Sequence, residues 1–399
     1  MVQRIHLVAA ARPNFMKVAP LWHALKAAPG FEPALIHTGQ HYDVNMSDAF
    51  FADLRLPEPD FHLGVGSGSH AEQTGGVMIE YEKIALKDRP DWLIVVGDVN
   101  STAACTLVAA KLGFSVVHLE AGLRSRDRAM PEEVNRLVTD VLADVLWTPS
   151  PDADENLIAE GVAPQRISRV GNIMLDSFEL VRPAIESADV PGEMKLKRGG
   201  YGVVTLHRPS NVDDPAQLVR LVDALIELQW RLPLIFPVHP RTAKRLRAGL
   251  FDGRLARAGV KLVDPLPYVR FMSLVSGAAA AITDSGGIQE ETTYLGIPCL
   301  TLRENTERPI TISEGSNRLV KPETLLLELD KALDGPRPTR CPELWDGKTA
   351  ARCVEDLNRR SKAVRLPVEP ASPAELVRRY GAEERRKISG RSSYRRSSL

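Results

Sequence analysis

Residues 92–122 read WLIVVGDVNSTAACTLVAAKLGFSVVHLEAG, and this stretch decides the fold class. Two short apolar runs, residues 92–96 and 115–119, enclose a longer amphipathic segment over residues 101–111. Continuous apolar runs of this length predict strands buried on both faces, and a helix between two such strands makes their pairing parallel. The stretch therefore predicts a strand–helix–strand unit in a parallel sheet that helices cover.

The same alternation extends outward from this unit to both sides. Before the polar segment 187–200, we expect further strands over residues 5–10, 34–37, 145–147 and 167–170, and helices over 14–27, 71–86, 132–142 and 174–185. After that segment, we expect strands over residues 201–206, 234–238, 260–263, 279–283 and 297–300, and helices over 215–229, 268–275 and 288–295. Each half has the pattern and size of one Rossmann-like domain.

The fold class predicted is therefore α/β, with two Rossmann-like domains. We expect an N-terminal domain over residues 1–186, a linker over 187–200, and a C-terminal domain over 201–366 that ends in a helix within 348–366. The last stretch, 367–399, is predicted to be mostly a disordered tail. Its final residues, 381–399, are rich in Ser and Arg and lack apolar periodicity, which is typical of a solvated segment.

Composition excludes several classes of protein. The chain has 399 residues, with 51 Lys+Arg against 51 Asp+Glu, and this zero net charge gives no reason to expect nucleic acid as a partner. The 4 cysteines form no CxxC pair, so neither a disulfide framework nor a zinc site is predicted. The start lacks the apolar core of a signal peptide, and no apolar run approaches the ~20 residues of a membrane span. We expect a cytoplasmic protein.

Polar residues that directly follow the predicted strands carry the chemical information, because ligands of open parallel sheets bind at that edge. In the first half these are Arg12 and Lys17 at a helix start, Asp98 after Gly97, and Glu120. Asp98 serves equally well as a helix cap or as an acid/base group. In Pro131-Glu132-Glu133, a helix start explains one of the two acids. Glu120 and the other acid remain as candidate acid/base carboxylates.

In the second half, two histidines follow neighbouring strands, His207 and His239, where an imidazole can act as an acid, base or phosphate donor. The strongest local signal is Asp284-Ser285-Gly286-Gly287, a small-residue turn between a strand and a helix. Backbone N–H groups at Ser285, Gly286 and Gly287 are expected to face a phosphate. Glu291, one turn along, is placed to accept hydrogen bonds from ribose hydroxyls.

Motifs of other enzyme classes are absent from the sequence. It contains no GxxxxGK[ST], no GxGxxG after the first strand, and no GxSxG. These absences disfavour a P-loop nucleotidase, a dinucleotide-binding fingerprint and a nucleophile elbow. No His, Cys or Asp cluster has metal-ligand spacing, so no metal is expected.

Eight of these segments together resemble the non-hydrolysing UDP-N-acetylglucosamine 2-epimerases, and they occur in that family's order. They are Arg12-Pro13 with Lys17, Gly97-Asp98, His118 to Arg124, Pro131-Glu132-Glu133 with Asn135-Arg136, Thr205 to Arg208, Val238-His239-Pro240, Asp284 to Glu291, and Arg303 to Pro309. The resemblance implies a glycosyltransferase-B type of fold, with two Rossmann-like domains facing across a cleft. It also implies inversion of C2 of UDP-GlcNAc through elimination of UDP to a 2-acetamidoglucal and re-addition, without NAD or metal.

The resemblance also implies roles for single residues. Asp98, Glu120 and Glu132 would be the acid/base carboxylates, and His207 would assist departure of UDP. The nucleotide and sugar would be held by Arg12, Lys17, Arg136, His239, Ser285, Gly286, Gly287 and Glu291. A homodimer is expected, the UDP-sugar is the expected partner, and the helix within residues 348–366 is expected to cross back onto the first domain.

The sequence departs from the usual family pattern at three places: Ala11-Arg12-Pro13-Asn14, Tyr42-Asp43 after His41, and Pro209-Ser210-Asn211 after Arg208. The last two correspond to positions that help hold an activating second UDP-GlcNAc in typical bacterial members. We hypothesise that this enzyme lacks that requirement or uses a differently substituted UDP-sugar. A glycosyltransferase of the same fold, a hydrolysing epimerase and a non-catalytic nucleotide-sugar-binding protein remain alternatives, because a fold alone does not decide between them.

Overall fold

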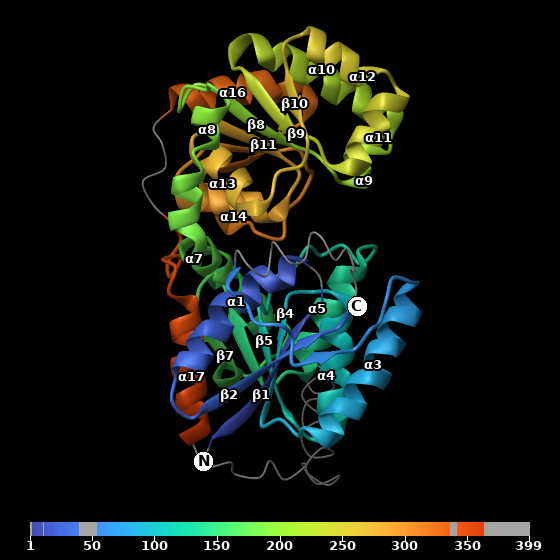
Figure 1. The fold of residues 1–399 in the computed structure, drawn as a ribbon, viewed down its shortest axis with the longest axis vertical. Helices are drawn as coiled ribbons and strands as arrows, with labels where there is room; N and C mark the ends of the chain where they lie inside the picture. The colour runs from blue at the N-terminus through green and yellow to red at the C-terminus, as the bar shows by residue number, and fades with distance from the viewer. Residues whose placement is uncertain (1, 11, 40–53, 336–340, 363–399) are drawn as a thin grey trace, which may run out of the picture. The chain divides into compact units, whose positions relative to one another are not determined.

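The computed structural model contains two parallel β-sheets, one of seven strands and one of six (Figure 1). It describes residues 2–10, 12–39, 54–335 and 341–362, and for Arg12 and Pro13 only the backbone. Both sheets belong to one compact unit that ends at Asp356.

The first sheet has the order β3-β2-β1-β4-β5-β6-β7, and all its pairings are parallel. Its strands are β1 (Gln3–Ala9), β2 (Phe31–His37), β3 (Phe61–His62), β4 (Trp92–Val96), β5 (Ser115–Leu119), β6 (Val145–Thr148) and β7 (Ile167–Arg169). The helices between them are α1 (Arg12–Ala27), α3 (His70–Lys87), α4 (Asn100–Leu112), α5 (Pro131–Leu142) and α6 (Pro151–Ala159). The predicted α/β class is confirmed, and the strands predicted at 92–96 and 115–119 have the predicted bounds.

The second sheet has the order β10-β9-β8-β11-β12-β13, again parallel throughout. Its strands are β8 (Gly202–Thr205), β9 (Leu234–Pro237), β10 (Lys261–Val263), β11 (Ala280–Thr283), β12 (Cys299–Thr301) and β13 (Asn317–Leu319). Its helices are α9 (Pro209–Val212), α10 (Pro215–Arg231), α11 (Pro240–Ala248), α12 (Phe251–Arg257), α13 (Tyr268–Ser276), α14 (Gly286–Leu295), α15 (Ile310–Ser313) and α16 (Leu325–Asp334). In both sheets the order in which strands are added reverses beside the first strand, β1 or β8, and ligands of doubly wound folds bind at this point.

The segment predicted as a linker contains helical structure. Helix α7 (Ile173–Ala188) extends into it, and a short helix α8 (Val190–Glu193) follows within it. Val190 is buried, and its N–H donates to the hydroxyl of Ser273 on α13 at 3.2 Å. The buried residues of α8 are Val190 and Pro191, and the polar residues around them concealed this helix in the sequence. The domain boundaries themselves stay a prediction.

The helix expected within residues 348–366 is present as α17 (Thr349–Lys362). Asp356 on this helix accepts hydrogen bonds from Trp147 Nε1 of β6 at 2.8 Å and from Ser168 Oγ of β7 at 3.0 Å. Asp176 of α7 accepts from the N–H groups of Thr349 and Ala350 at 3.0 and 2.7 Å. These contacts connect the part of the helix up to Asp356 with the first sheet and with α7.

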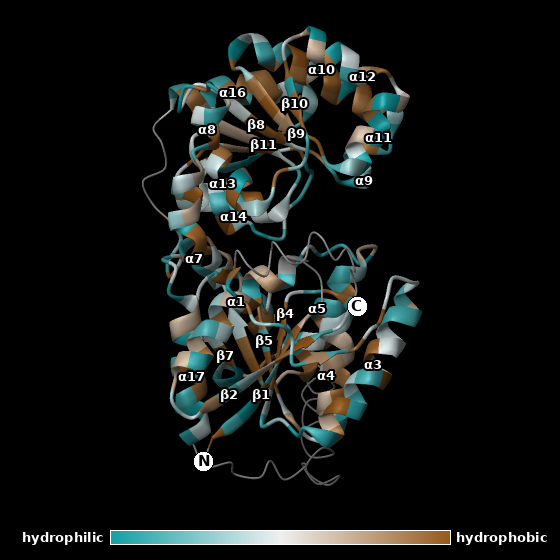
Figure 2. Ribbon diagram, in the orientation of Figure 1, coloured by the Kyte–Doolittle hydropathy of each residue, from teal (hydrophilic) through white to brown (hydrophobic). Residues whose placement is uncertain are grey.

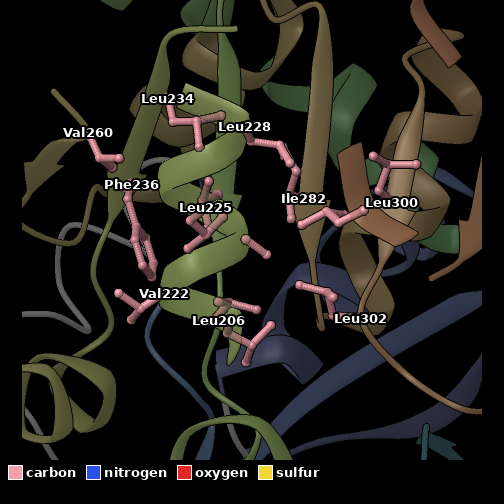
Figure 3. Close-up of a cluster of buried hydrophobic side chains, with 14 of the residues drawn as sticks. Leu206, Val222, Leu225, Leu228, Leu234, Phe236, Val260, Ile282, Leu300 and Leu302 are labelled. Atoms are coloured by element: carbon pink, nitrogen blue, oxygen red, sulfur yellow. The ribbon is translucent and has the colours of Figure 1, made fainter. Parts of the chain in front are cut away.

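The cores explain why the predicted strands form. In the second half, α10 directs Val222, Leu225 and Leu228 toward the strand residues Leu234, Phe236 and Ile282 (Figure 3). Brown and teal residues alternate along α10 in Figure 2, as expected for a helix with one buried and one exposed side. Among the described residues, no helix combines the length and apolar character needed to cross a bilayer.

Candidate active site

A close approach of side chains marks the end of β4. Gly97 has a φ of 67°, and a Cβ added there would lie 3.3 Å from Lys17 Nζ and 3.6 Å from Glu120 Oε2. A side chain at this position would therefore be strained and crowded, which explains the glycine. The ends of β4, β5 and the start of α1 thus meet at one point.

Glu120 is the most constrained of the candidate catalytic groups. It has a φ of 70°, a conformation that residues other than glycine rarely adopt, and it is buried. Its Oε2 pairs with Lys17, whereas Oε1 is buried without a hydrogen-bond partner among the described residues. Backbone strain and an unsatisfied buried oxygen persist mainly where function requires them. The structure therefore supports a chemical role for Glu120.

Asp98, directly after Gly97, is held by a guanidinium. Arg136 donates to Oδ2 of Asp98 from Nε at 3.1 Å and from Nη2 at 2.6 Å. Burial opposes ionisation of Asp98, but Arg136 and Lys17 outweigh it, so its pKa lies below the usual value. Asp98 is thus poised as a carboxylate, and the Arg136 predicted to bind substrate is engaged with it.

The two acids of the first turn of α5 have different environments. Glu133 is buried and accepts from the N–H groups of Ser125 and Arg126 at 2.9 and 2.8 Å, as well as from Arg136 at 2.6 Å. Its oxygens are therefore occupied by the fold. Glu132 is exposed and has no such contacts among the described residues. Of the pair, Glu132 is the one available for chemistry.

Sequence reasoning missed a buried pair behind these carboxylates. His118 of β5 places Nδ1 2.6 Å from Asp140 of α5, and its Nε2 donates to the carbonyl of Gly97 at 2.8 Å. Asp140 also accepts from the N–H of Gly122 at 3.0 Å. This pair ties the loops after β4 and β5 together. The sequence feature that could have indicated this pair is His118 itself, a polar residue within an otherwise apolar strand.

In the second half, His207 is oriented by Asp284. The imidazole Nδ1 lies 3.0 Å from Asp284 Oδ1, and Asp284 also accepts from the N–H groups of His207 and Arg208. Asp284 is fully buried, yet its interactions with His207 and these N–H groups keep its pKa below the usual value despite burial. With Nδ1 facing the carboxylate, Nε2 is left for a ligand. The sequence singled out His207 but not the partner that orients it.

His239 lies beside His207, with ring centroids 5.7 Å apart. It caps α11, because its Nδ1 accepts from the N–H of Arg241 at 3.3 Å. Burial, His207 and Arg241 lower its pKa, so the ring is neutral with Nε2 as the donor. The two histidines predicted from separate strand ends are therefore brought together.

The turn Ser285-Gly286-Gly287 begins helix α14, as the phosphate prediction requires. The N–H of Ser285 donates to Thr283 Oγ1 at 2.9 Å, so it has an internal partner. First-turn N–H groups such as those of Gly286 and Gly287 have no partner within the helix. A Cβ at Gly287 would meet nothing within 4 Å, which leaves open space in front of this helix end.

Glu291 lies on the same helix and is buried. Its Oε1 accepts from the hydroxyl of Tyr268 at 2.7 Å. Burial, with a smaller contribution from Glu290, raises its pKa to about 8. Glu291 is thus a mostly protonated acid near neutral pH that can exchange hydrogen bonds with hydroxyl groups.

Some predicted site residues lie outside the described part of the chain. The side chain of Arg12 is not described, and neither is the departure at Tyr42-Asp43. Within the described ranges, no three His, Cys, Asp or Glu side chains gather as a metal site.

Comparison with known proteins places this arrangement in a family. A sequence model described as UDP-N-acetylglucosamine 2-epimerase matches residues 23–358. The UDP-N-acetylglucosamine 2-epimerase of Methanocaldococcus jannaschii is 39% identical over 369 residues, covering 89% of this chain and 98% of the relative. The crystal structure of a Methanocaldococcus jannaschii UDP-GlcNAc 2-epimerase in complex with UDP-GlcNAc and UDP superposes with a TM-score of 0.81, covering 89% of this chain and 99% of that one.

A second relative acts on a modified sugar. The UDP-2,3-diacetamido-2,3-dideoxy-D-glucuronate 2-epimerase of Pseudomonas aeruginosa is 38% identical over 320 residues, covering 79% of this chain and 88% of the relative. The extent of this similarity agrees with the matched motifs and with the two parallel sheets of the glycosyltransferase-B type. These observations together assign the chain to one family. The chain belongs to the UDP-N-acetylglucosamine 2-epimerase family.

Proposed function

We propose that this protein interconverts UDP-GlcNAc and UDP-ManNAc by inverting C2 without net hydrolysis. The observation that carries the proposal is the strained, buried Glu120 beside Lys17 and Asp98, in a chain of the epimerase family. Carboxylates gathered at a strand end suit proton transfer on a sugar ring better than simple glycosyl transfer.

The reaction is an elimination followed by an addition. A carboxylate takes the proton from C2, the C2–H electron pair becomes the C1=C2 double bond, and the C1–O pair leaves with the β-phosphate oxygen of UDP. Re-addition protonates C2 on the opposite face while the same oxygen attacks C1. Electron pairs move without a net change of oxidation state, so the chemistry requires neither NAD nor another redox cofactor.

Within this scheme Asp98, Glu120 and Glu132 are the proton-transferring carboxylates. Cleavage of C1–O builds positive charge on C1, and a carboxylate close to the ring offsets that charge. The ion pair of Asp98 with Arg136 supports a role for Asp98 as a base, because it keeps the carboxyl ionised. His207 in its protonated form, whose positive charge Asp284 balances, donates from Nε2 to the departing diphosphate.

The remaining residues bind the nucleotide and sugar. Gly286 and Gly287 at the start of α14, with Ser285, bind the diphosphate, and Glu291 binds the ribose hydroxyls. His239 donates to a phosphate beside His207. Arg12 and Lys17 at the start of α1 supply positive charge, and Arg136 acts through Asp98.

Proton NMR of UDP-GlcNAc incubated with the protein in D2O tests the proposal. We expect UDP-ManNAc carrying deuterium at C2, with no acceptor, metal or NAD added. The variant Glu120→Gln should lose turnover but still bind UDP. The exposed surface variant Glu186→Gln should retain both turnover and UDP binding. Release of free ManNAc with UDP would indicate a hydrolysing enzyme, and product formation only with an added acceptor would indicate a glycosyltransferase.

A modified UDP-sugar is the second candidate substrate. The Pseudomonas aeruginosa relative that acts on a 2,3-diacetamido glucuronate is almost as similar to this chain as the UDP-GlcNAc enzyme of Methanocaldococcus jannaschii, at 38% against 39% identity. Parallel assays with both sugars decide between them by the ratio of kcat/KM values.

We further propose a cytoplasmic homodimer. The four cysteines are free thiols, which suits a reducing compartment. Ile79 and Leu86 on α3, and Val134 and Val141 on α5, are exposed apolar side chains spaced by one heptad on each helix, which suits contact with a second copy. Sedimentation velocity should show a dimer, and Ile79→Glu combined with Val141→Glu should shift it toward the monomer.

A further inference from the structure

A buried histidine lies behind the carboxylates at the ends of β4 and β5. His118 is in β5, two positions before Glu120, and the side chains of His118 and Asp140 are 0% and 1% exposed. The ring places Nε2 2.8 Å from the carbonyl of Gly97 and Nδ1 2.6 Å from Oδ1 of Asp140. Each ring nitrogen therefore faces an oxygen atom. A carbonyl oxygen only accepts hydrogen bonds, so Nε2 carries a proton.

The contact between Nδ1 and Oδ1 also needs a proton, which belongs either to the ring or to the carboxyl group. The surroundings of Asp140 assign it. Oδ2 of Asp140 accepts from the N–H of Gly122 at 3.0 Å and lies 2.8 Å from Nη1 of Arg124. Burial opposes ionisation of Asp140, but His118 and Arg124 outweigh it, so the pKa of Asp140 lies below the usual value. Asp140 is thus a carboxylate, and His118 is an imidazolium with both ring nitrogens protonated.

The charges of the four side chains in this group balance when His118 is protonated. Arg124, whose side chain is 2% exposed, donates to Glu160 from Nε at 2.8 Å and from Nη2 at 2.7 Å. The two cations, His118 and Arg124, thus face the two carboxylates of Asp140 and Glu160. A neutral imidazole would leave the group with a net negative charge, and burial of an uncompensated charge costs free energy.

The imidazolium holds the backbone that carries Asp98. The N–H of Gly97 donates to the carbonyl of Leu119 at 3.0 Å, and the carbonyl of Gly97 accepts from His118. Both polar backbone groups of Gly97 are therefore bound to β5. Because the carbonyl of Gly97 belongs to the peptide group that leads into Asp98, His118 fixes the plane from which the Asp98 residue projects.

Asp140 holds the second loop in the same way. It binds the N–H of Gly122, two residues after Glu120, and the carbonyl of Gly122 accepts from Asn156 Nδ2 at 3.0 Å. Glu120 keeps its left-handed backbone, with a φ of 70°, between β5 and this bound glycine. One buried pair thus fixes the loops that carry both candidate carboxylates.

We propose that His118 is a positioning residue: as a buried imidazolium, it sets the separation of Asp98 and Glu120 for proton transfer at C2. This role rests on the function proposed above. Because its side chain is fully buried, His118 acts through the carbonyl of Gly97, and it keeps its proton throughout the reaction. A charged donor holds a carbonyl more strongly than a neutral donor does. An error of about 1 Å in the placement of a reacting group lowers the rate by up to about 10²-fold.

NMR of the protein labelled with ¹⁵N in its histidine rings tests the charge independently of turnover. At about pH 8 an ordinary histidine, with a pKa of about 6.5, carries one ring proton, whereas His118 should carry protons on both Nδ1 and Nε2. The signals that vanish in His118→Gln assign the residue. His6 of β1 is the internal comparison, because it is also fully buried beside a carboxylate, Asp88, but burial lowers its pKa. An Nδ1 of His118 without a proton at that pH would overturn the proposal.

Two substitutions separate the contacts of the ring. The side-chain amide of His118→Gln places its nitrogen near the position of Nε2, where it still reaches Gly97. The shorter amide of His118→Asn places its nitrogen near Nδ1, where it reaches only Asp140. We expect kcat to fall about 10²-fold in His118→Asn but less than about tenfold in His118→Gln, with KM changed by less than about threefold in both. An equal loss of kcat in the two variants, or a loss confined to KM, would overturn the role.

His6→Gln is the matched control for the loss of a buried histidine, and it should change kcat by less than about threefold even where it lowers the melting temperature. A loss of kcat equal to that of His118→Asn would show that lost stability, rather than positioning, accounts for the effect. If His118→Asn does not fold, Asp140→Asn takes its place, because it removes the charge that holds the imidazolium; a kcat within about threefold of wild type would then overturn the role. If the unaltered protein does not epimerise UDP-GlcNAc, the proposed function fails, whereas the NMR signals of His118 still decide its charge.

Discussion

At the scale of single residues, the orientation of His207 depends on Asp284. Asp284→Asn removes the charge that faces Nδ1, so the imidazole can present the wrong nitrogen to the leaving group. We expect kcat to fall about 10²-fold or more, close to the loss in His207→Asn, with a smaller change in UDP affinity. Steady-state kinetics by NMR measures this. Asp213→Asn, at a surface ion pair with Arg241, is the control, and a kcat within about threefold of wild type in Asp284→Asn would refute the dependence.

Glu291 gives the protein a pH-dependent stability. Its pKa of about 8 in the folded state exceeds the usual 4.5, so the folded state binds a proton that the unfolded chain has released. This stabilisation is complete below about pH 4.5 and is lost as pH rises through 8, by up to about 1.4 kcal/mol per pH unit. Glu291→Gln should lose less stability than wild type between about pH 5.5 and 8.5 in denaturant titrations. If the stability of Glu291→Gln fell with pH as steeply as that of wild type, this prediction would be contradicted. The same would follow if the exposed control variant Glu304→Gln showed the same reduced loss of stability.

At the scale of elements, the start of α14 has space for a ligand rather than for side chains. Gly287→Ala adds a methyl group that meets no protein atom within 4 Å, so the helix should form as before and gain up to about 1 kcal/mol. The same methyl group enters the space assigned to the diphosphate, and UDP affinity should fall at least about tenfold. Thermal unfolding and calorimetry measure the two effects. Gly253→Ala within α12 should change stability only, and unchanged UDP binding in Gly287→Ala would remove α14 from the site.

At the scale of the whole molecule, we expect the rate to depend hyperbolically on UDP-GlcNAc. The family resemblance implies that Tyr42-Asp43 and Pro209-Ser210-Asn211 replace residues that would help hold an activating second substrate molecule. In the structure Asn211 is buried and donates to Asp284 and to the carbonyl of Leu302, so it serves the fold beside His207. Initial rates over a wide substrate range test this expectation. A sigmoidal curve would show that activation persists through other residues.

Both sheets, apart from their edge strands β3 and β13, were predictable from the amino-acid pattern, which also predicts the edge at which the candidate site lies. Buried parallel strands need continuous apolar runs, so residues 92–96 and 115–119 were readable without any contact information. Short or polar elements were missed, among them β3, α6, α11, α12 and the helix α8 inside the predicted linker. Their stability comes from packing against distant segments rather than from their own pattern.

The pairing of charged groups, in contrast, is apparent only once the chain is folded. His207 and Asp284 are 77 positions apart, and Lys17 and Glu120 are 103 apart. The sequence left Glu132 and Glu133 as alternatives, and the buried contacts of Glu133 with Arg136 distinguish them. The local pattern of apolar residues indicates which residues are buried. The ionisation and pairing of a buried charged group depend on neighbours that only the folded chain brings within a few ångströms.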